Sequence, residues 1–142
     1  MNERIDFRFS PLLFLLFALF VVILFVYGTL MCGGVRHGVL AGQRFLGAAR
    51  TRPYYALFDL GAYPGLVYSE TEGRAIHGEL YEIDAGLIPR LDRIEGAPSL
   101  FRLEHVLIEG YDGEVFAYFY QGSVEKSSRC AEDRWKPKRG TL

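Results

Sequence analysis

The sequence predicts an α+β domain built as a small mixed β-barrel with short flanking helices. Aromatic residues make up 15% of the chain and glycine occurs 16 times, which is typical of strands and tight turns. Short apolar or alternating segments recur along the chain between turn residues, as strands do. Helical spacing is clear only at residues 87–94, so a doubly wound parallel sheet, whose strands alternate with helices, is not expected.

The composition limits the class of function. A chain of 142 residues fits one domain, and 50% hydrophobic residues with a net charge of −1 exclude an intrinsically disordered protein. The same net charge argues against nucleic acid as a partner. Cys32 and Cys130 lie far apart and the three histidines are isolated, which indicates neither a disulfide framework nor a metal site.

The N-terminal segment is strongly apolar and allows three interpretations. Residues 9–35 carry no charge, and residues 12–26 form a continuous apolar run. As a membrane helix this run would be about 22 Å long, short of a hydrocarbon core of about 30 Å. As a signal peptide it lacks a cleavage site with small residues. We favour a buried β-strand at residues 22–27, because its residues are β-branched and aromatic.

This interpretation divides the chain into three parts: an apolar prefix at residues 1–21, a domain at residues 22–120 and a polar tail at residues 121–142. The prefix is an anchor, a packing segment or the product of a start codon placed too far upstream. A large apolar patch is rarely left exposed on a monomer. Weak membrane association through residues 12–21 therefore stays open beside the expected cytoplasmic location.

The elements after the first strand follow from pattern and turn signals. Residues 28–42 form a glycine-rich loop with a short helix around residues 35–40. The helix at residues 87–94 has its apolar residues on one stripe, Asp84 as N-cap and Gly96 as stop signal. Further strands are expected at residues 43–52, 54–60, 66–68, 74–83, 101–109 and 114–120, the last two joined in a hairpin by a turn at residues 110–113.

Two segments are candidates for chemistry. The loop at residues 27–30 ends a buried strand and exposes consecutive backbone N–H groups, which bind carboxylates and oxyanions. Glu95 lies one position beyond Ile94 on the apolar stripe of the helix, and burial there would raise its pKa toward that of a general base and acid. Plain structural interpretations stay open for both: a turn that needs glycine, and a solvated glutamate at a helix end.

The order of several short motifs carries a resemblance. The motifs are LFVYGTL at residues 24–30, RFLGAA at 44–49, YPGL at 63–66, GELYEI at 78–83, LDRIEG at 91–96, Pro98 and VFAYFY at 115–120. In this order, over residues 22–120, the chain resembles the gamma-glutamylcyclotransferase-like family, in the branch of gamma-glutamylamine cyclotransferase and AIG2-like proteins. The resemblance implies a small mixed β-barrel with flanking helices.

The resemblance also implies an enzyme that needs no cofactor. The α-amine of a small γ-glutamyl substrate attacks its own γ-carbonyl, which forms 5-oxoproline and releases an amine or amino acid. By position, Glu95 would take the proton from the substrate ammonium and deliver it to the leaving amine. The backbone N–H groups of Gly28, Thr29 and Leu30 would hold the substrate carboxylate or the developing oxyanion.

The resemblance further implies that Tyr27 and Tyr120 line the substrate pocket. Two positions depart from the family pattern, because Phe101 and Leu103 stand where the family usually has a tyrosine and an arginine. A binding module that keeps the cavity without catalysing a reaction is therefore the alternative function. Such a module would recognise an acidic small molecule or the end of a peptide.

Overall fold

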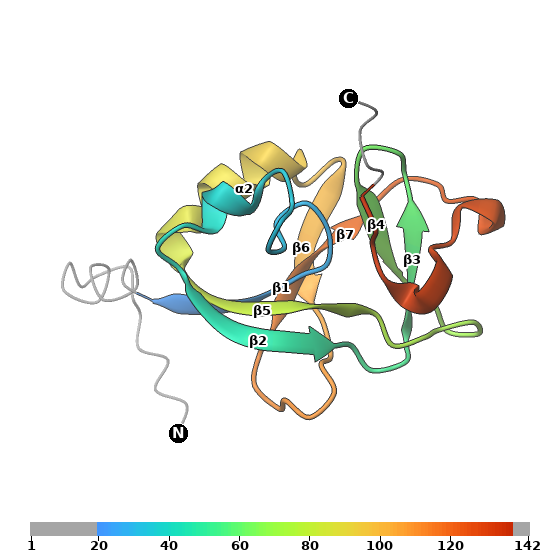
Figure 1. The fold of residues 1–142 in the computed structure, drawn as a ribbon, viewed down its shortest axis with the longest axis horizontal. Helices are drawn as coiled ribbons and strands as arrows, with labels where there is room; N and C mark the ends of the chain where they lie inside the picture. The colour runs from blue at the N-terminus through green and yellow to red at the C-terminus, as the bar shows by residue number, and fades with distance from the viewer. Residues whose placement is uncertain (1–19, 138–142) are drawn as a thin grey trace, which may run out of the picture.

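The computed structural model describes residues 20–137 and contains seven strands and one α-helix (Figure 1). The interpretations of residues 1–19 as anchor, signal peptide or prefix lie outside these residues. The regular elements are β1 (Val21–Val26), β2 (Arg44–Arg50), β3 (Tyr55–Asp59), β4 (Pro64–Tyr68), β5 (His77–Asp84), α2 (Ile88–Glu95), β6 (Phe101–His105) and β7 (Phe116–Tyr120). The 3-10 turns are η2 (His37–Leu40), η3 (Ala85–Leu87), η4 (Lys126–Ser128) and η5 (Ala131–Asp133).

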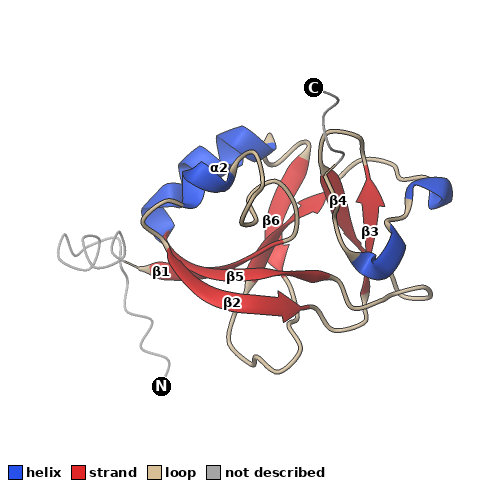
Figure 2. Ribbon diagram, viewed as in Figure 1, coloured by secondary structure: helices blue, strands red, loops and turns tan. Residues whose placement is uncertain are grey.

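The strands form one mixed sheet in the order β2-β5-β1-β7-β4-β3, with β6 paired to β7 (Figure 2). β7 runs parallel to β1 and to β4, whereas the other pairs are antiparallel. The prediction of a mixed sheet with a short helix is confirmed. Among the described strands, no pairing joins β2 to β3, so the expected closure into a barrel is not observed.

β1 lies inside the sheet and is buried on both faces toward its C-terminal end. Leu24 and Val26 belong to an apolar cluster that includes Leu91 of α2, whereas Phe25 and the following Tyr27 belong to the cluster around Trp135. Successive side chains of a strand point to opposite faces. A strand covered on both sides therefore needs a continuous apolar run, which explains the sequence of this segment.

Helix α2 brings its C-terminal end to the cavity described below. Its stop signal is confirmed, since Gly96 adopts a left-handed conformation at φ 63°. The expected N-cap is wrong: Asp84 precedes the turn η3 and its side chain makes no capping hydrogen bond. Of the helices described, none has the length and apolarity needed to cross a bilayer.

The connection from β6 to β7 is longer than the expected four-residue turn. After β6, the chain leaves β7 to meet the residues at the end of β2. The Arg52 N–H donates to Leu107 O at 2.9 Å, and the Glu109 N–H donates to Arg50 O at 2.9 Å. The predicted hairpin of β6 with β7 is therefore present, from the pair Phe101–Tyr120 to the pair His105–Phe116, but residues 107–109 pair with a distant segment and lengthen its connection.

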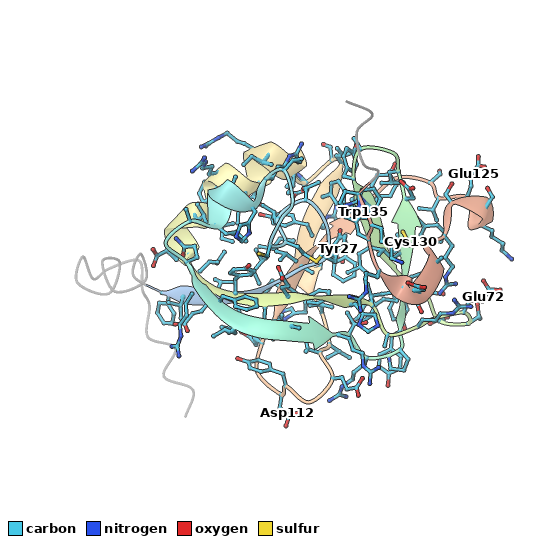
Figure 3. The ribbon with its side chains drawn as sticks, viewed as in Figure 1. Tyr27, Glu72, Asp112, Glu125, Cys130 and Trp135 are labelled. Atoms are coloured by element: carbon cyan, nitrogen blue, oxygen red, sulfur yellow. The ribbon has the colours of Figure 1, made fainter. Side chains whose placement is uncertain are left out.

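The segment after β7 has more structure than its polar sequence suggests. Trp135 is only 6% exposed and packs in the cluster that contains Phe25 and Tyr27. The Cys130 N–H donates to Leu57 O of β3 at 2.8 Å. Figure 3 shows Cys130 and Trp135 at the same end of the molecule. Residues 129–135 therefore pack against β3, which the sequence analysis did not anticipate.

Candidate active site

One cavity is lined by the loop after β1, the end of α2 and parts of β4, β6 and β7. In Figure 1 this loop, drawn in blue, curls beside α2. The cavity opens partly to solvent, and its own volume is about 30 Å³. The lining residues are Phe25, Val26, Tyr27, Gly28, Thr29, Leu30, Arg36, Tyr63, Pro64, Glu95, Phe101 and Tyr118.

The loop folds back on itself through its own backbone. The Met31 N–H donates to Gly28 O at 3.0 Å, and the Arg36 N–H donates to Thr29 O at 2.9 Å. Gly28 allows a close approach to β4, because a Cβ at this position would lie 2.6 Å from Pro64 Cγ. Within residues 20–137, the N–H groups of residues 28–30 donate to no other protein group. They are therefore available to a ligand with a negative oxygen.

Glu95 is the last residue of α2, and its half-buried carboxylate lines the cavity. Burial raises the pKa of Glu95, because removal of water disfavours the charged form. The positive charge of Arg36 acts in the opposite direction and lowers this pKa. The carboxylate is thus a stronger proton acceptor than an exposed glutamate, and it lies in a position to meet a bound molecule.

Of the three tyrosines that line the cavity, Tyr27 and Tyr118 have hydroxyl groups with partners inside the protein. The Tyr27 hydroxyl donates to Tyr118 O and accepts from the Leu66 N–H at 3.3 Å. Burial, followed by the charge of Glu95, raises the pKa of Tyr27 far above its ordinary value. The Tyr118 hydroxyl donates to Asp92 Oδ1 at 2.7 Å, which connects β7 to α2. Figure 3 shows Tyr27 in the interior of the fold.

The structure brings together most of the residues that the sequence analysis selected. Tyr27, Gly28, Thr29, Leu30 and Glu95 line the same cavity, although 65 positions separate Leu30 from Glu95. Tyr120 is not among the lining residues. Its ring packs on Phe101, with ring centroids 5.5 Å apart, so it supports a residue that does line the cavity.

The sequence analysis missed Arg36, Tyr63 and Tyr118. For Arg36 a signal exists, since it is the first charged residue after the long uncharged segment and follows the glycine loop. For the two tyrosines no local signal marks one aromatic residue of a strand or turn above another. As to metals, no three His, Cys, Asp or Glu side chains of the described residues are grouped in a way that would hold an ion.

The family model described as "Gamma-glutamyl cyclotransferase, AIG2-like" matches residues 24–137, which includes the whole cavity. The chain belongs to this family. The match of this gamma-glutamyl cyclotransferase family enzyme to the family model extends beyond β7 to residue 137. It therefore includes Trp135, which packs in the core.

Relatives with curated names support the assignment. A Vibrio cholerae protein named "Putative gamma-glutamylcyclotransferase" is 41% identical over 113 residues, which are 80% of this chain and 94% of that protein. Bovine gamma-glutamylaminecyclotransferase is 33% identical over 105 residues, 68% of this chain and 62% of that protein. The chain therefore matches less than two thirds of the length of the bovine relative.

Solved structures share the fold of this family member. An AIG2-like protein from Mus musculus superimposes with a TM-score of 0.70 at 24% identity, over 82% of this chain and 88% of that one. An uncharacterized protein from Pyrococcus horikoshii superimposes with a TM-score of 0.66 at 26% identity, over 80% of this chain and 88% of that one.

Proposed function

We propose that this protein converts a small γ-glutamyl amide into 5-oxoproline and a free amine or amino acid, with Glu95 as general base and acid. One observation carries the proposal: the Glu95 carboxylate and the loop at residues 27–30 line one cavity. Family membership supports the reaction class. The identity of the leaving amine is left to the experiment below.

The reaction places its nucleophile and electrophile in one molecule. Ionised Glu95 accepts a proton from the α-ammonium of the substrate, and the neutral α-amine attacks the γ-carbonyl carbon. A C–N bond forms, and the carbonyl oxygen becomes an oxyanion. Protonated Glu95 then delivers its proton to the leaving nitrogen, the oxyanion collapses to a carbonyl and the original amide C–N bond breaks. The ring nitrogen gives up its second proton to the released amine, which leaves as an ammonium, and 5-oxoproline remains.

The half-buried setting of Glu95 suits both halves of this cycle. A general base and acid acts best when its pKa is near the working pH, because it must both accept and release the proton. Desolvation raises the pKa of Glu95 above its ordinary value, and the positive charge of Arg36 opposes this shift. An exposed glutamate with an ordinary pKa would be a weaker base.

The backbone of the loop supports a role in charge stabilisation. The N–H groups of Gly28, Thr29 and Leu30 donate to no other protein group among the described residues, and all three residues line the cavity. Fixed N–H donors aimed at a developing oxyanion lower the barrier of acyl transfer by several kcal/mol, about 3 for one donor. Phe101 lines the same cavity.

A direct assay for 5-oxoproline tests the proposal. The purified protein is incubated with a panel of γ-glutamyl amines and γ-glutamyl amino acids, beside Glu95→Gln. We expect product from the parent with at least one member, and a loss of about 100-fold or more in Glu95→Gln. Glu114→Gln is the matched control, because the Glu114 side chain is 79% exposed and lies outside the cavity.

No product from a folded parent with any member of the panel would contradict the enzymatic proposal. If 5-oxoproline then bound to the parent and to Glu95→Gln with the same affinity, the protein would be a binding module of the same fold.

A further inference from the structure

The charges that line the cavity form a pair of opposite sign. Of its lining residues, two are charged: Arg36 from the loop and Glu95 from the end of α2. The remaining lining residues are apolar, aromatic or neutral. A ligand that enters this cavity therefore meets one cationic group and one anionic group at close quarters.

Arg36 is held between the two segments that make the cavity. Its backbone N–H donates to Thr29 O at 2.9 Å, and its Nη1 donates to Ile94 O at 3.4 Å. Ile94 immediately precedes Glu95. The guanidinium therefore lies beside the residue proposed as the base, and it connects the glycine loop to the end of α2.

Most of the hydrogen-bonding capacity of Arg36 is unused. A guanidinium carries five N–H donors in a planar fork, and the single long bond to Ile94 O uses one of them. Among residues 20–137, no carboxylate lies within ion-pair distance of Arg36. A half-buried guanidinium whose N–H donors are mostly unused by the protein is suited to bind an anionic group of a ligand.

We propose that Arg36 binds the α-carboxylate of the substrate, while Glu95 faces its α-ammonium. This inference rests on the proposed function, which requires a γ-glutamyl group with a free α-amine. Such a group carries an ammonium and a carboxylate on one carbon. The cavity offers the complementary pair, the Glu95 carboxylate and the Arg36 guanidinium, which donates to the backbone oxygen of the neighbouring Ile94.

Binding at both charged groups has a consequence for the reaction. Contacts to the two charged groups on the substrate's α-carbon orient the substrate side chain that ends in the γ-carbonyl. Orientation is the main requirement of an intramolecular attack. The N–H groups of residues 28–30 are then free for the oxyanion, because the carboxylate has its own partner. Arg36 thus selects substrates whose α-carboxylate is free.

The experiment compares two substrates that differ only at this group. One is a γ-glutamyl amine that the parent turns over, and the other is its α-carboxamide, which cyclises to 5-oxoprolinamide. We expect the parent to prefer the carboxylate in kcat/KM by about 10- to 100-fold. Arg36→Gln should lose this preference, with kcat/KM falling by a similar factor for the carboxylate and by less than about threefold for the carboxamide.

Two further variants separate recognition from structure. Arg36→Lys keeps the charge without the planar fork, and we expect it to retain part of the preference. Arg44→Gln is the matched control, because Arg44 is 76% exposed and outside the cavity. If Arg36 had only a structural role, Arg36→Gln would lower kcat/KM by the same factor for both substrates. The preference for the carboxylate would then be unchanged, and this result would overturn the proposal.

A binding measurement distinguishes this inference from the proposed function. Titration calorimetry compares 5-oxoproline with 5-oxoprolinamide on the parent and on folded Arg36→Gln. Weaker binding of 5-oxoproline alone in Arg36→Gln would support the inference even if no substrate were turned over. If Arg36→Gln weakened the binding of both ligands equally, or weakened neither, the inference would be contradicted whatever the activity of the protein.

Discussion

The backbone N–H of Cys32 donates a hydrogen bond to Glu79 Oε1 at 2.8 Å, which ties the loop after β1 to the adjacent strand β5. The Tyr81 hydroxyl donates to the same oxygen at 3.4 Å. Cys32 lies two positions after Leu30, so this carboxylate holds the loop whose N–H groups line the cavity. Glu79 is therefore a positioning residue, without contact to the proposed substrate site.

Substitution of Glu79 by alanine should loosen the loop more than it destabilises the fold. We expect kcat/KM to fall by about 10-fold, since small displacements of oriented groups slow intramolecular reactions, with a change in unfolding free energy of about 1 kcal/mol. Glu79→Gln should restore most of the activity, because its amide oxygen accepts the same bond. The control is Glu82→Ala, because Glu82 lies on the opposite face of β5. An equal fall in kcat/KM for this variant would refute the role of Glu79.

The Tyr27 hydroxyl connects three strands, so its removal should affect stability. Tyr27→Phe leaves Tyr118 O and the Leu66 N–H without this partner in a buried environment. We expect the unfolding free energy to fall by about 1–3 kcal/mol in denaturant titrations. Tyr68→Phe should change it by less than about 0.5 kcal/mol, because Tyr68 is 61% exposed. Equal values for the two variants would show that the Tyr27 hydroxyl contributes nothing.

Glu95 should make the stability of the protein depend on pH. Burial raises its pKa in the folded state above the ordinary value of 4.5, so the unfolded chain loses this proton first as the pH rises. The destabilisation of the fold by the ionised carboxylate therefore begins at about pH 4.5, grows until the pH passes the folded pKa, and stays constant above it. Below that window the carboxyl group is neutral in both states and has no such effect.

Glu95→Gln should accordingly be more stable than the parent at neutral pH but not in acid. The melting temperatures of the two proteins are compared from about pH 4 to about pH 8. We expect the difference to be smallest at acid pH and to increase through the window. A constant difference across this range would mean that the carboxyl group does not titrate with a raised pKa.

Gly28 should tolerate no side chain, although its backbone conformation is not the reason. A Cβ would lie 2.6 Å from Pro64 Cγ, and both residues line the cavity. Gly28→Ala must displace β4 or the loop, at a cost of about 1–3 kcal/mol in unfolding free energy, with loss of activity. Gly38→Ala is the control, since a Cβ there meets nothing within 4 Å. Full activity in Gly28→Ala would show that the cavity accommodates the shift.

Much of the fold follows from local patterns that the sequence carries by itself. The apolar run at residues 22–27 predicts β1, because a strand buried on both faces needs apolar residues at successive positions. The stripe at residues 87–94 and Gly96 predict α2 and its end, since helical periodicity and a left-handed cap are local properties. The motifs around residues 27–30 and 95 likewise identify the two segments that line the cavity.

Other features depend on contacts between residues far apart in the chain, which no local pattern encodes. The hairpin of β6 and β7 forms, but its connection is longer than the expected turn at residues 110–113, because residues 107–109 pair with the end of β2. The polar tail packs through Trp135. Arg36 reaches the site only because its guanidinium meets Ile94 O across 58 positions. Residue types and periodicity therefore determined the elements and the chemistry available, whereas packing between distant segments decided which charges share the cavity.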